Sequence, residues 1–361
     1  MEKRYLVKIY QRNGTTLTLN IPHNALRSFP TWSDRINGGM GECTIDYAIP
    51  FDDFGEGTII DHQFILDVYV FDADHPAGRR MYRGAIQEYE PYISGAMQGV
   101  KVKALGLASN LSFDAYMASA RSSYTVSHAA VDPQIIFKAI IDEYRAAVNN
   151  PLINYAVGST QALGTNVSKN YVDRTWFDSC QDTRDLCGTG WWWHVDADGI
   201  AYLLPKPSSV SHRFVIGRDI QEGNFPKSAK GVKNKIRVTR SGGAVSTYTD
   251  ATSISKYESR LQIISDSTLN DATTADQRGN KELNDGKDTK VKSTMVINEN
   301  YDLESIKVGQ TCSILNSNGS AAFFGSNVLI GGIQYNGDTV QIDFEESVTD
   351  LGASLDKFVN G

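Results

Sequence analysis

Alternation of apolar and polar residues runs through the first hundred positions of the chain and predicts a series of β-strands. Tyr5, Val7 and Ile9 occupy every second position near the start, and a mostly apolar run follows at 64–71. Because successive side chains of a strand point to opposite faces, each run has one face for a core. Residues 1–110 are therefore expected to be all-β, with six or seven strands that form a barrel or a sandwich.

Turn-forming residues between these runs mark where the chain is expected to leave the strands. Asn13-Gly14 is a strong signal for a tight turn, so the first twenty residues predict a hairpin. Residues 21–40 are rich in proline and glycine and predict a loop, and a further strand is expected at 41–49.

The hydrophobic spacing becomes helical after the first β region. Asp132-Pro133 is a helix-capping residue followed by proline at the first helical position, and apolar residues recur from Ile136 at helical spacing. The same reasoning predicts a second helix at 175–187 and a hairpin at 191–204. Residues 111–207 are therefore expected to form a small α+β domain inserted between β regions.

Strand patterns return in the last third of the chain, around a further helix expected at 272–283. Residues 251–361 are expected to form a second β-barrel domain with this helix and a short C-terminal tail. Strands are expected at 214–216, 235–240, 245–249, 292–297, 310–315, 327–335 and 339–344.

Two hairpins far apart in the sequence resemble each other and indicate that the two β regions are copies of one unit. Gly-Ala-Ile-Gln-Glu-Tyr at 84–89 is matched by Gly-Gly-Ile-Gln-Tyr at 331–335. Val-Lys-Val-Lys-Ala at 100–104 is matched by Val-Gln-Ile-Asp-Phe at 340–344. Any two hairpins share some alternation, but the common Gly-x-Ile-Gln favours a duplicated domain. Two copies at so long a period do not make a solenoid.

The composition is that of an acidic globular protein. The 361 residues are 41% hydrophobic and 21% charged, with a net charge of −7, which argues against disorder and against tight general binding to nucleic acid. No run of about 18 apolar residues is present, and the charged N-terminus lacks the apolar segment of a signal peptide. The four cysteines are expected to be reduced and packed, and the six histidines show no metal-binding spacing.

Sequence motifs of catalysis and cofactor binding are absent: there is no nucleophile elbow, zinc-protease motif, Walker loop or dinucleotide fingerprint. The adjacent carboxylates Asp52-Asp53 and Glu345-Glu346 would point to opposite faces of a strand, so neither is a natural acid–base pair. We therefore expect no enzyme activity and no cofactor.

One candidate binding cluster is the aromatic run Trp191, Trp192 and Trp193. Consecutive strand residues alternate between faces, so at most two of these rings can share one. The run is expected to serve either core packing or stacking on a glycan or a base.

A second candidate cluster is an acid-free basic stretch in an otherwise acidic protein. It runs over 227–240 and carries Lys227, Lys230, Lys233, Lys235, Arg237 and Arg240, of which Lys230, Lys233, Lys235 and Arg237 are the candidate subunit or channel contacts. The stretch could face nucleic acid or an acidic partner subunit, or it could be a solvated strand edge on which lysines block stray pairing.

Several segments, in order along the chain, together resemble one known family. They are Gly38–Ile45, Phe51–Phe54, VYVFD at 68–72, YRGAIQEYEPYISG at 82–95, VKVKALG at 100–106, Asp132-Pro133, WWWHVDADGIAYLLPKP at 191–207 and DATSISKYESR at 250–260. The chain resembles phage tail hub proteins, which include the N-terminal module of siphophage tail-associated proteins and are similar to the central hub of contractile baseplates. The resemblance covers almost the whole chain.

The resemblance implies a structural virion protein. In such hubs two tube-like β-barrel domains per chain repeat three times around an axis, so a homotrimer meets a sixfold tail tube as a symmetry adaptor. The resemblance implies that residues 1–110 form the first tube-like β-barrel domain, completed by part of 208–250, and that residues 251–361 form the second. The implied location is the tail tip, after synthesis in the host cytoplasm. The implied partners are the distal tail or tail-tube ring, the tape-measure protein, a central fibre or receptor-binding protein, and DNA in passage.

The chain departs from many siphophage relatives because it ends at Gly361, after the second barrel, without their hydrolase or fibre. We therefore carry no lytic activity over to it: either the chain is a minimal hub, or the longer parts belong to other proteins. Three alternatives remain open: a carbohydrate-binding adhesion module of the tail tip, the hub of a phage-like contractile injection device, and a cell-wall hydrolase.

Overall fold

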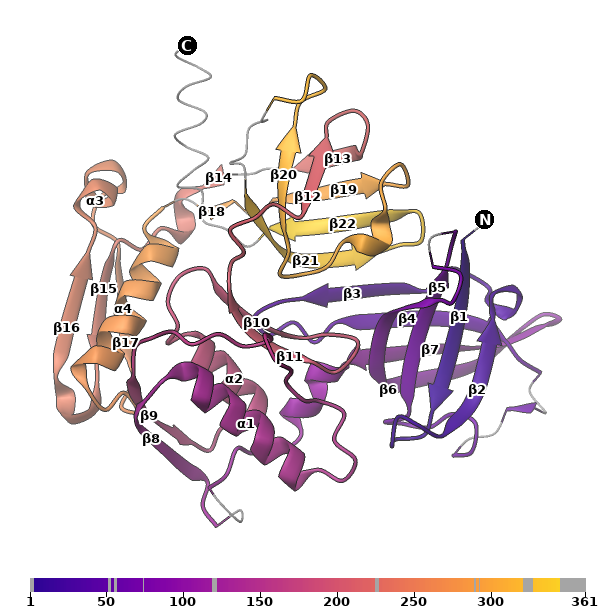
Figure 1. The fold of residues 1–361 in the computed structure, drawn as a ribbon, viewed down its shortest axis with the longest axis horizontal. Coiled ribbons are helices and arrows are strands. Elements are labelled where there is room, and N and C mark those ends of the chain that lie inside the picture. Colours follow the sequence, from indigo (N-terminus) through magenta and orange to yellow (C-terminus); the bar gives the residue numbers. More distant parts are fainter. Residues whose placement is uncertain are drawn as a thin grey trace.

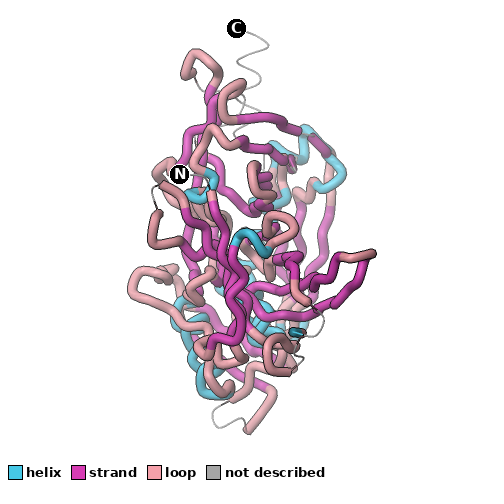
Figure 2. Tube along the Cα trace, turned by 90° about the vertical axis from the view of Figure 1, so that its right-hand side faces the viewer, coloured by secondary structure: helices cyan, strands magenta, loops and turns pink. Residues whose placement is uncertain are grey.

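The computed structural model describes residues 3–344 except 51–52, 55–56, 74, 119–121, 225–226, 289, 292 and 321–326. More of these residues lie in strands than in helices, and Figures 1 and 2 show the strands from two directions. The expected fold class, mainly β with an α+β insertion, is therefore confirmed.

The first β unit is a curled sheet of seven strands in the order β3-β4-β7-β6-β5-β1-β2, with antiparallel ladders throughout. Tyr5, Val7 and Ile9 are buried, as their alternation predicts. A bridge from Leu26 to Tyr47 links the segment after β2 to β4, but no ladder between described strands closes the unit into a barrel. The strands are β1 (Arg4–Tyr10), β2 (Leu17–Pro22), β3 (Thr31–Arg35), β4 (Glu42–Ala48), β5 (Ile65–Phe71), β6 (Arg79–Ser94) and β7 (Met97–Gly106).

Strand β3 lies where the sequence predicted a loop. Thr31–Arg35 follows Pro30 and carries no apolar alternation, so its local pattern is that of a loop. It is a strand because it pairs with β4 on one side and with β21 (Val328–Tyr335) on the other. The apolar alternation within a segment does not show whether the segment pairs with residues far away in the sequence.

The second β unit repeats the strand order of the first. Its order β20-β21-β22-β19-β13 corresponds to β5-β6-β7-β4-β3, so the expected duplication is present in the topology. The units differ at one edge, because β12 pairs with β20 in parallel whereas β1 pairs with β5 antiparallel. The strands are β12 (His212–Val215), β13 (Ile220–Asn224), β19 (Thr294–Asn298), β20 (Thr311–Leu315), β21 and β22 (Thr339–Phe344).

The structure corrects one half of the match between the two hairpins. Ile86 exchanges two backbone hydrogen bonds with residues 63–64, and Ile330 exchanges two with residues 309–310. Both hairpin ladders shift register immediately after these isoleucines. Ile86 therefore corresponds to Ile330, and the Gly-x-Ile-Gln motifs lie three residues out of register. The second halves of the hairpins match as the sequence indicated, since Ala104 faces Ile86 and Phe344 faces Ile330.

The expectation that part of 208–250 completes the first barrel is wrong. β12 and β13 pair with strands of the second unit. Phe214 on β12 is fully buried and packs against Tyr301 with ring centroids 4.8 Å apart, and burial of this large aromatic side chain holds β12 in the second unit. Further along, β15 (Lys235–Thr239) and β16 (Val245–Thr249) form a separate sheet with β17 (Leu261–Ser265).

The insertion and the separate sheet share one hydrophobic core. Asp132 caps the first helix by accepting a hydrogen bond from the Gln134 amide at 2.8 Å, as predicted. Ile236 and Val238 of β15 join this core beneath α4, which covers the sheet in Figure 1. The elements are β8 (Thr125–Val131), α1 (Pro133–Ala147), β9 (Val167–Val172), α2 (Trp176–Arg184), β10 (Trp191–Val195), β11 (Ala201–Pro205), β14 (Lys227–Ser228), α3 (Ala251–Tyr257), α4 (Ala272–Gly286) and β18 (Lys290–Val291).

A buried charge network joins α2 to α4. The Lys281 ammonium is buried and lies 3.2 Å from Asp185 and 3.0 Å from Asp285, and Arg278 lies 2.5 Å from Asp185. Burial alone would raise the pKa of the Asp185 carboxyl, but Lys281, Arg278 and Arg184 outweigh it and lower that pKa to about 2.

This network is expected to make stability fall in acid. The pKa of Asp185 is lower in the folded chain than in the unfolded chain, where it is about 3.9. Its stabilising contribution is therefore complete above about pH 4 and is lost as the pH falls toward about 2. The free energy of unfolding can be measured with urea at about pH 6 and at about pH 2.5. Between these two pH values it is expected to fall by about 1–2 kcal/mol less in Asp185→Asn than in the unmodified chain. An equal pH dependence in the variant and the unmodified chain would contradict the assignment.

Candidate functional site

The two β units meet in a ladder between β3 and the C-terminal half of β21, which joins them into one continuous sheet; we call this ladder the seam. The seam runs antiparallel from Arg35 opposite Gly332 to Trp32 opposite Tyr335. The Trp32 and Tyr335 rings stack with centroids 3.9 Å apart and an interplanar angle of 10°, and Arg35 lies 2.5 Å from Asp343. Backbone pairing, ring stacking and an ion pair thus build the seam together.

A buried carboxylate ties the N-terminus to the second unit beside the seam. Glu304 lies 2.7 Å from the Lys3 ammonium and accepts a hydrogen bond from the Tyr335 hydroxyl at 2.6 Å. The Tyr5 hydroxyl lies 3.2 Å from that of Tyr335. Burial, with Tyr5 and Glu304 as further causes, raises the pKa of Tyr335 well above its ordinary value. Tyr335 therefore keeps its proton and remains a donor to Glu304.

All three tryptophans of the aromatic run are buried. Trp191 and Trp193 belong to the core of the insertion, and the Trp193 indole donates a hydrogen bond to the Gln181 side chain at 2.9 Å. Trp192 belongs to a different cluster, so the run divides between two faces as its alternation predicts. Because the rings are only 1–9% exposed, none presents an open face on which a glycan could stack.

Trp192 lies where the insertion meets both β units. It packs in one cluster with Ile36 of the first unit and with Val308 and Leu329 of the second. A Cβ at Gly309 would lie 2.5 Å from the Trp192 indole, so glycine provides the room for this ring. Trp192 is therefore a packing residue that holds three parts of the chain together.

The basic stretch occupies two different settings. Lys235 and Arg237 lie on the outer face of β15, alternating with the buried Ile236 and Val238. β15 is the central strand of its three-stranded sheet, so these two residues do not lie on a strand edge. Lys230 and Lys233 precede β15 in an exposed connection that follows β13 and β14.

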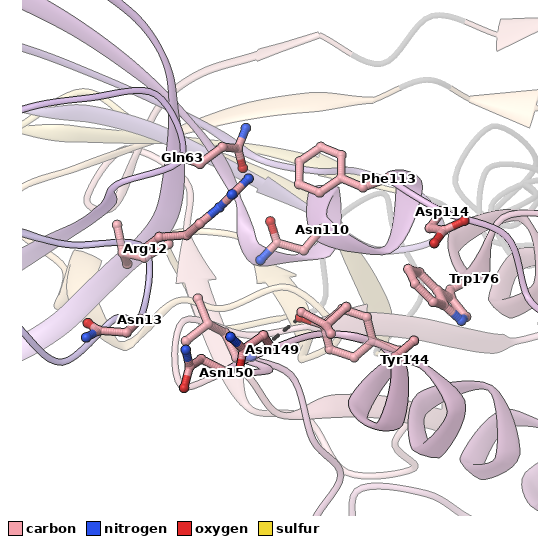
Figure 3. Close-up of a pocket in the computed structure, with 14 residues that line it drawn as sticks. Arg12, Asn13, Gln63, Asn110, Phe113, Asp114, Tyr144, Asn149, Asn150 and Trp176 are labelled. Carbon is pink, nitrogen blue, oxygen red and sulfur yellow. Dashed lines mark hydrogen bonds between the residues drawn. The ribbon is translucent and has the colours of Figure 1, made fainter. Parts of the chain in front are cut away.

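A pocket of about 450 Å³, lined by both polar and apolar side chains, lies between the first β unit and the insertion (Figure 3). Its lining includes the amide side chains of Gln63, Asn110, Asn149 and Asn150, while Phe113 is 56% exposed. Such a lining offers hydrogen-bond donors and acceptors beside an aromatic ring. Sequence reasoning did not find this pocket, because its residues come from separate segments without a shared motif.

Within the described residues, no group of three or more histidine, cysteine, aspartate or glutamate side chains could hold a metal ion. A search of the same residues finds no helix that is long and apolar enough to cross a membrane. The four cysteines are buried and form no disulfide, as expected.

Comparison with known proteins gives a match at the level of the fold. No protein-family model and no curated protein matches the chain. The 43 kDa tail protein of prophage MuSo2 from Shewanella oneidensis aligns with a TM-score of 0.65 and 12% identity, over 94% of this chain and 98% of that one. The tail protein of Neisseria meningitidis MC58 aligns with a TM-score of 0.65 and 12% identity, over 95% and 97%.

A third similar structure comes from a secretion system. The Escherichia coli c3393 protein is described as a type VI secretion component that resembles the T4 phage tail proteins gp27 and gp5. It aligns with a TM-score of 0.51 and 11% identity, over 89% of this chain and 74% of that one. The resemblance inferred from the sequence is thus confirmed at the level of structure: this chain has the fold of phage tail proteins.

Proposed function

We propose that this chain is a non-enzymatic structural hub at the tip of a phage-type tail. Three copies form a ring that presents six similar β units, so a threefold assembly meets a sixfold tail tube. The observation that carries the proposal is the seam, which joins two units of one strand order edge to edge. A chain built this way already contains one of the contacts that a ring of six units repeats.

The ring encloses a channel for the tape-measure protein and later for DNA. The net charge of −7 suits such a passage, because an acidic wall does not hold the phosphate backbone. Its neighbours are the distal tail or tail-tube ring above and a central fibre or receptor-binding protein below. Its location is the virion tail tip, reached after synthesis in the host cytoplasm.

The same architecture also suits the hub of a phage-like contractile injection device. The structural similarity to a type VI secretion component favours this second setting. In both settings the chain performs one task, the conversion of sixfold to threefold symmetry.

Light scattering tests the proposed ring. The unmodified chain is expected to have a native mass three times the 39.7 kDa of one copy, at high protein concentration and moderate salt. A mass that stays at one copy over the whole concentration range contradicts the hub.

The carbohydrate-binding alternative now rests on the pocket of Figure 3, since the tryptophans are buried. If the pocket binds glycans, Phe113→Ala is expected to weaken binding on a glycan array about tenfold by removing an exposed aromatic surface. Val157→Ala is the matched control, because Val157 is fully exposed and lies outside the pocket. An array without signal for the unmodified chain rejects this alternative.

A further inference from the structure

The sheet of β16, β15 and β17 has one covered face and one open face. On the covered face, Ile236 and Val238 share a core with Leu283 of α4, which lies over the sheet in Figure 1. The ladder registers place nine side chains on the opposite face, which we call the outer face. They are Val245, Thr247 and Thr249 of β16, Lys235, Arg237 and Thr239 of β15, and Leu261, Ile263 and Ser265 of β17.

The outer face is unusually apolar for a surface that meets water. Val245, Leu261 and Ile263 are 46%, 52% and 60% exposed. β15 and β17 run parallel to each other. Parallel strands are usually covered on both faces, because the connections between them place helices there. An apolar open face beside a parallel pair therefore indicates a surface that a further element covers.

The charge of the outer face indicates the kind of element that fits it. Lys235 and Arg237 lie on its central strand, and none of its nine residues is acidic. In a chain with a net charge of −7, such a face attracts an acidic segment. Leu261 lies opposite Lys235, and Ile263 lies opposite Arg237. A fitting segment therefore carries carboxylates next to an apolar stripe.

The chain itself contains such a segment after its last described strand. Residues 345–361 lie outside the described residues, and their sequence is EESVTDLGASLDKFVNG. Four carboxylate side chains stand there against one lysine. The apolar residues recur at intervals of three and four, which predicts one apolar stripe along a helix. They are Val348, Leu351, Leu355 and Phe358.

The segment starts near the sheet that carries the outer face. The Phe344 amide donates a hydrogen bond to the Ser293 carbonyl at 3.1 Å, and Ser293 follows the end of α4 by seven residues. At that end, the Gly286 carbonyl accepts a hydrogen bond at 2.7 Å from the Lys233 amide, two residues before β15. The seventeen residues after Phe344 span up to about 60 Å when extended, so they are long enough to reach β15.

We propose that residues 345–361 cover the outer face of their own chain, as a helix whose apolar stripe packs on Leu261 and Ile263. The Asp356 carboxylate flanks that stripe and lies beside Arg237. The sheet then has a helix on each face, the arrangement that suits its parallel strands. This contact gives part of the basic stretch a role within one chain, and it does not depend on the proposed hub.

Cysteine cross-linking of the full-length chain tests this contact. Ile263→Cys and Val245→Cys are each combined with Leu355→Cys, treated with a short bismaleimide and digested for mass spectrometry. At least one of the two double variants is expected to give a cross-link within a single chain, while the buried native cysteines stay unreacted. Val157→Cys with Leu355→Cys is the matched control, because Val157 is fully exposed and lies outside the outer face.

A charge-reversal series supplies an independent readout. Arg237→Glu is expected to lower the yield of the cross-link about fivefold, and adding Asp356→Arg is expected to restore it. Arg213→Glu, at an exposed position of β12, is the matched control and is expected to leave the yield unchanged.

Three results would overturn the proposal. The first is the absence of a cross-link in both double variants. The second is a cross-link between chains alone, which assigns the outer face to a second copy. The third is a yield that Arg237→Glu leaves unchanged, which removes the charge match between the segment and the outer face.

Discussion

Gly84→Val is expected to destabilise the chain by about 3 kcal/mol, because the position has no room for a side chain. Gly84 lies on β6 directly opposite Gly106 on β7. A Cβ there would lie 2.3 Å from the Leu105 carbonyl oxygen and 2.4 Å from the Tyr82 hydroxyl. Backbone cannot move aside as the end of a flexible side chain can, so the β6–β7 ladder itself has to shift. Urea unfolding followed by circular dichroism measures the loss.

Gly231→Val is the matched control for this substitution. It adds the same side chain, but a Cβ at Gly231 meets no atom within 4 Å. We expect its free energy of unfolding to stay within about 0.5 kcal/mol of the unmodified chain. Equal stability of the Gly84 and Gly231 variants would show that the close approach at Gly84 is not a constraint in solution.

Trp192→Ala is expected to cost about 3–5 kcal/mol, because it empties a buried site shared by three parts of the chain. Trp192 is 6% exposed and packs with Ile36, Val308 and Leu329. Its loss removes the apolar contact through which the insertion holds both β units. We therefore expect a lower midpoint in thermal unfolding, and a transition that separates into more than one step as the parts unfold independently.

The same variant distinguishes packing from recognition. If Trp192 acts through packing, stability falls and any glycan signal of the unmodified chain survives in the fraction that remains folded. Val157→Ala again serves as a neutral control, because its side chain is fully exposed. Unchanged stability together with a lost glycan signal would assign Trp192 to binding and contradict the structural role.

The parts of the fold that could be predicted are those whose signal is local. Tyr5, Val7 and Ile9 alternate because one face of β1 packs in the core, and the sequence shows that period directly. The helix cap at Asp132 could be predicted because the capping residue and the following proline are neighbours in the sequence. The alternation of Trp191–Trp193 likewise predicted that the run divides between two faces.

The seam could not be predicted, because its signal is not local. β3 and β13 carry little apolar alternation, and each is a strand by virtue of pairing with residues far away in the sequence. The repeated Gly-x-Ile-Gln motif pointed to a real duplication, but it lies on opposite sides of the register shift in the two hairpins. The return of 208–250 to the first barrel was wrong because β12 and β13 pair with strands of the second unit, and the local sequence pattern does not show which strands pair.

Copies of this chain are expected to form a threefold ring of six similar β units. Electron cryomicroscopy of the purified full-length chain can image this assembly. We expect a ring of three copies around a channel, in which each copy contributes its two β units side by side. Single copies at every concentration, or a closed assembly without three copies around a channel, would show that the chain is not such a hub.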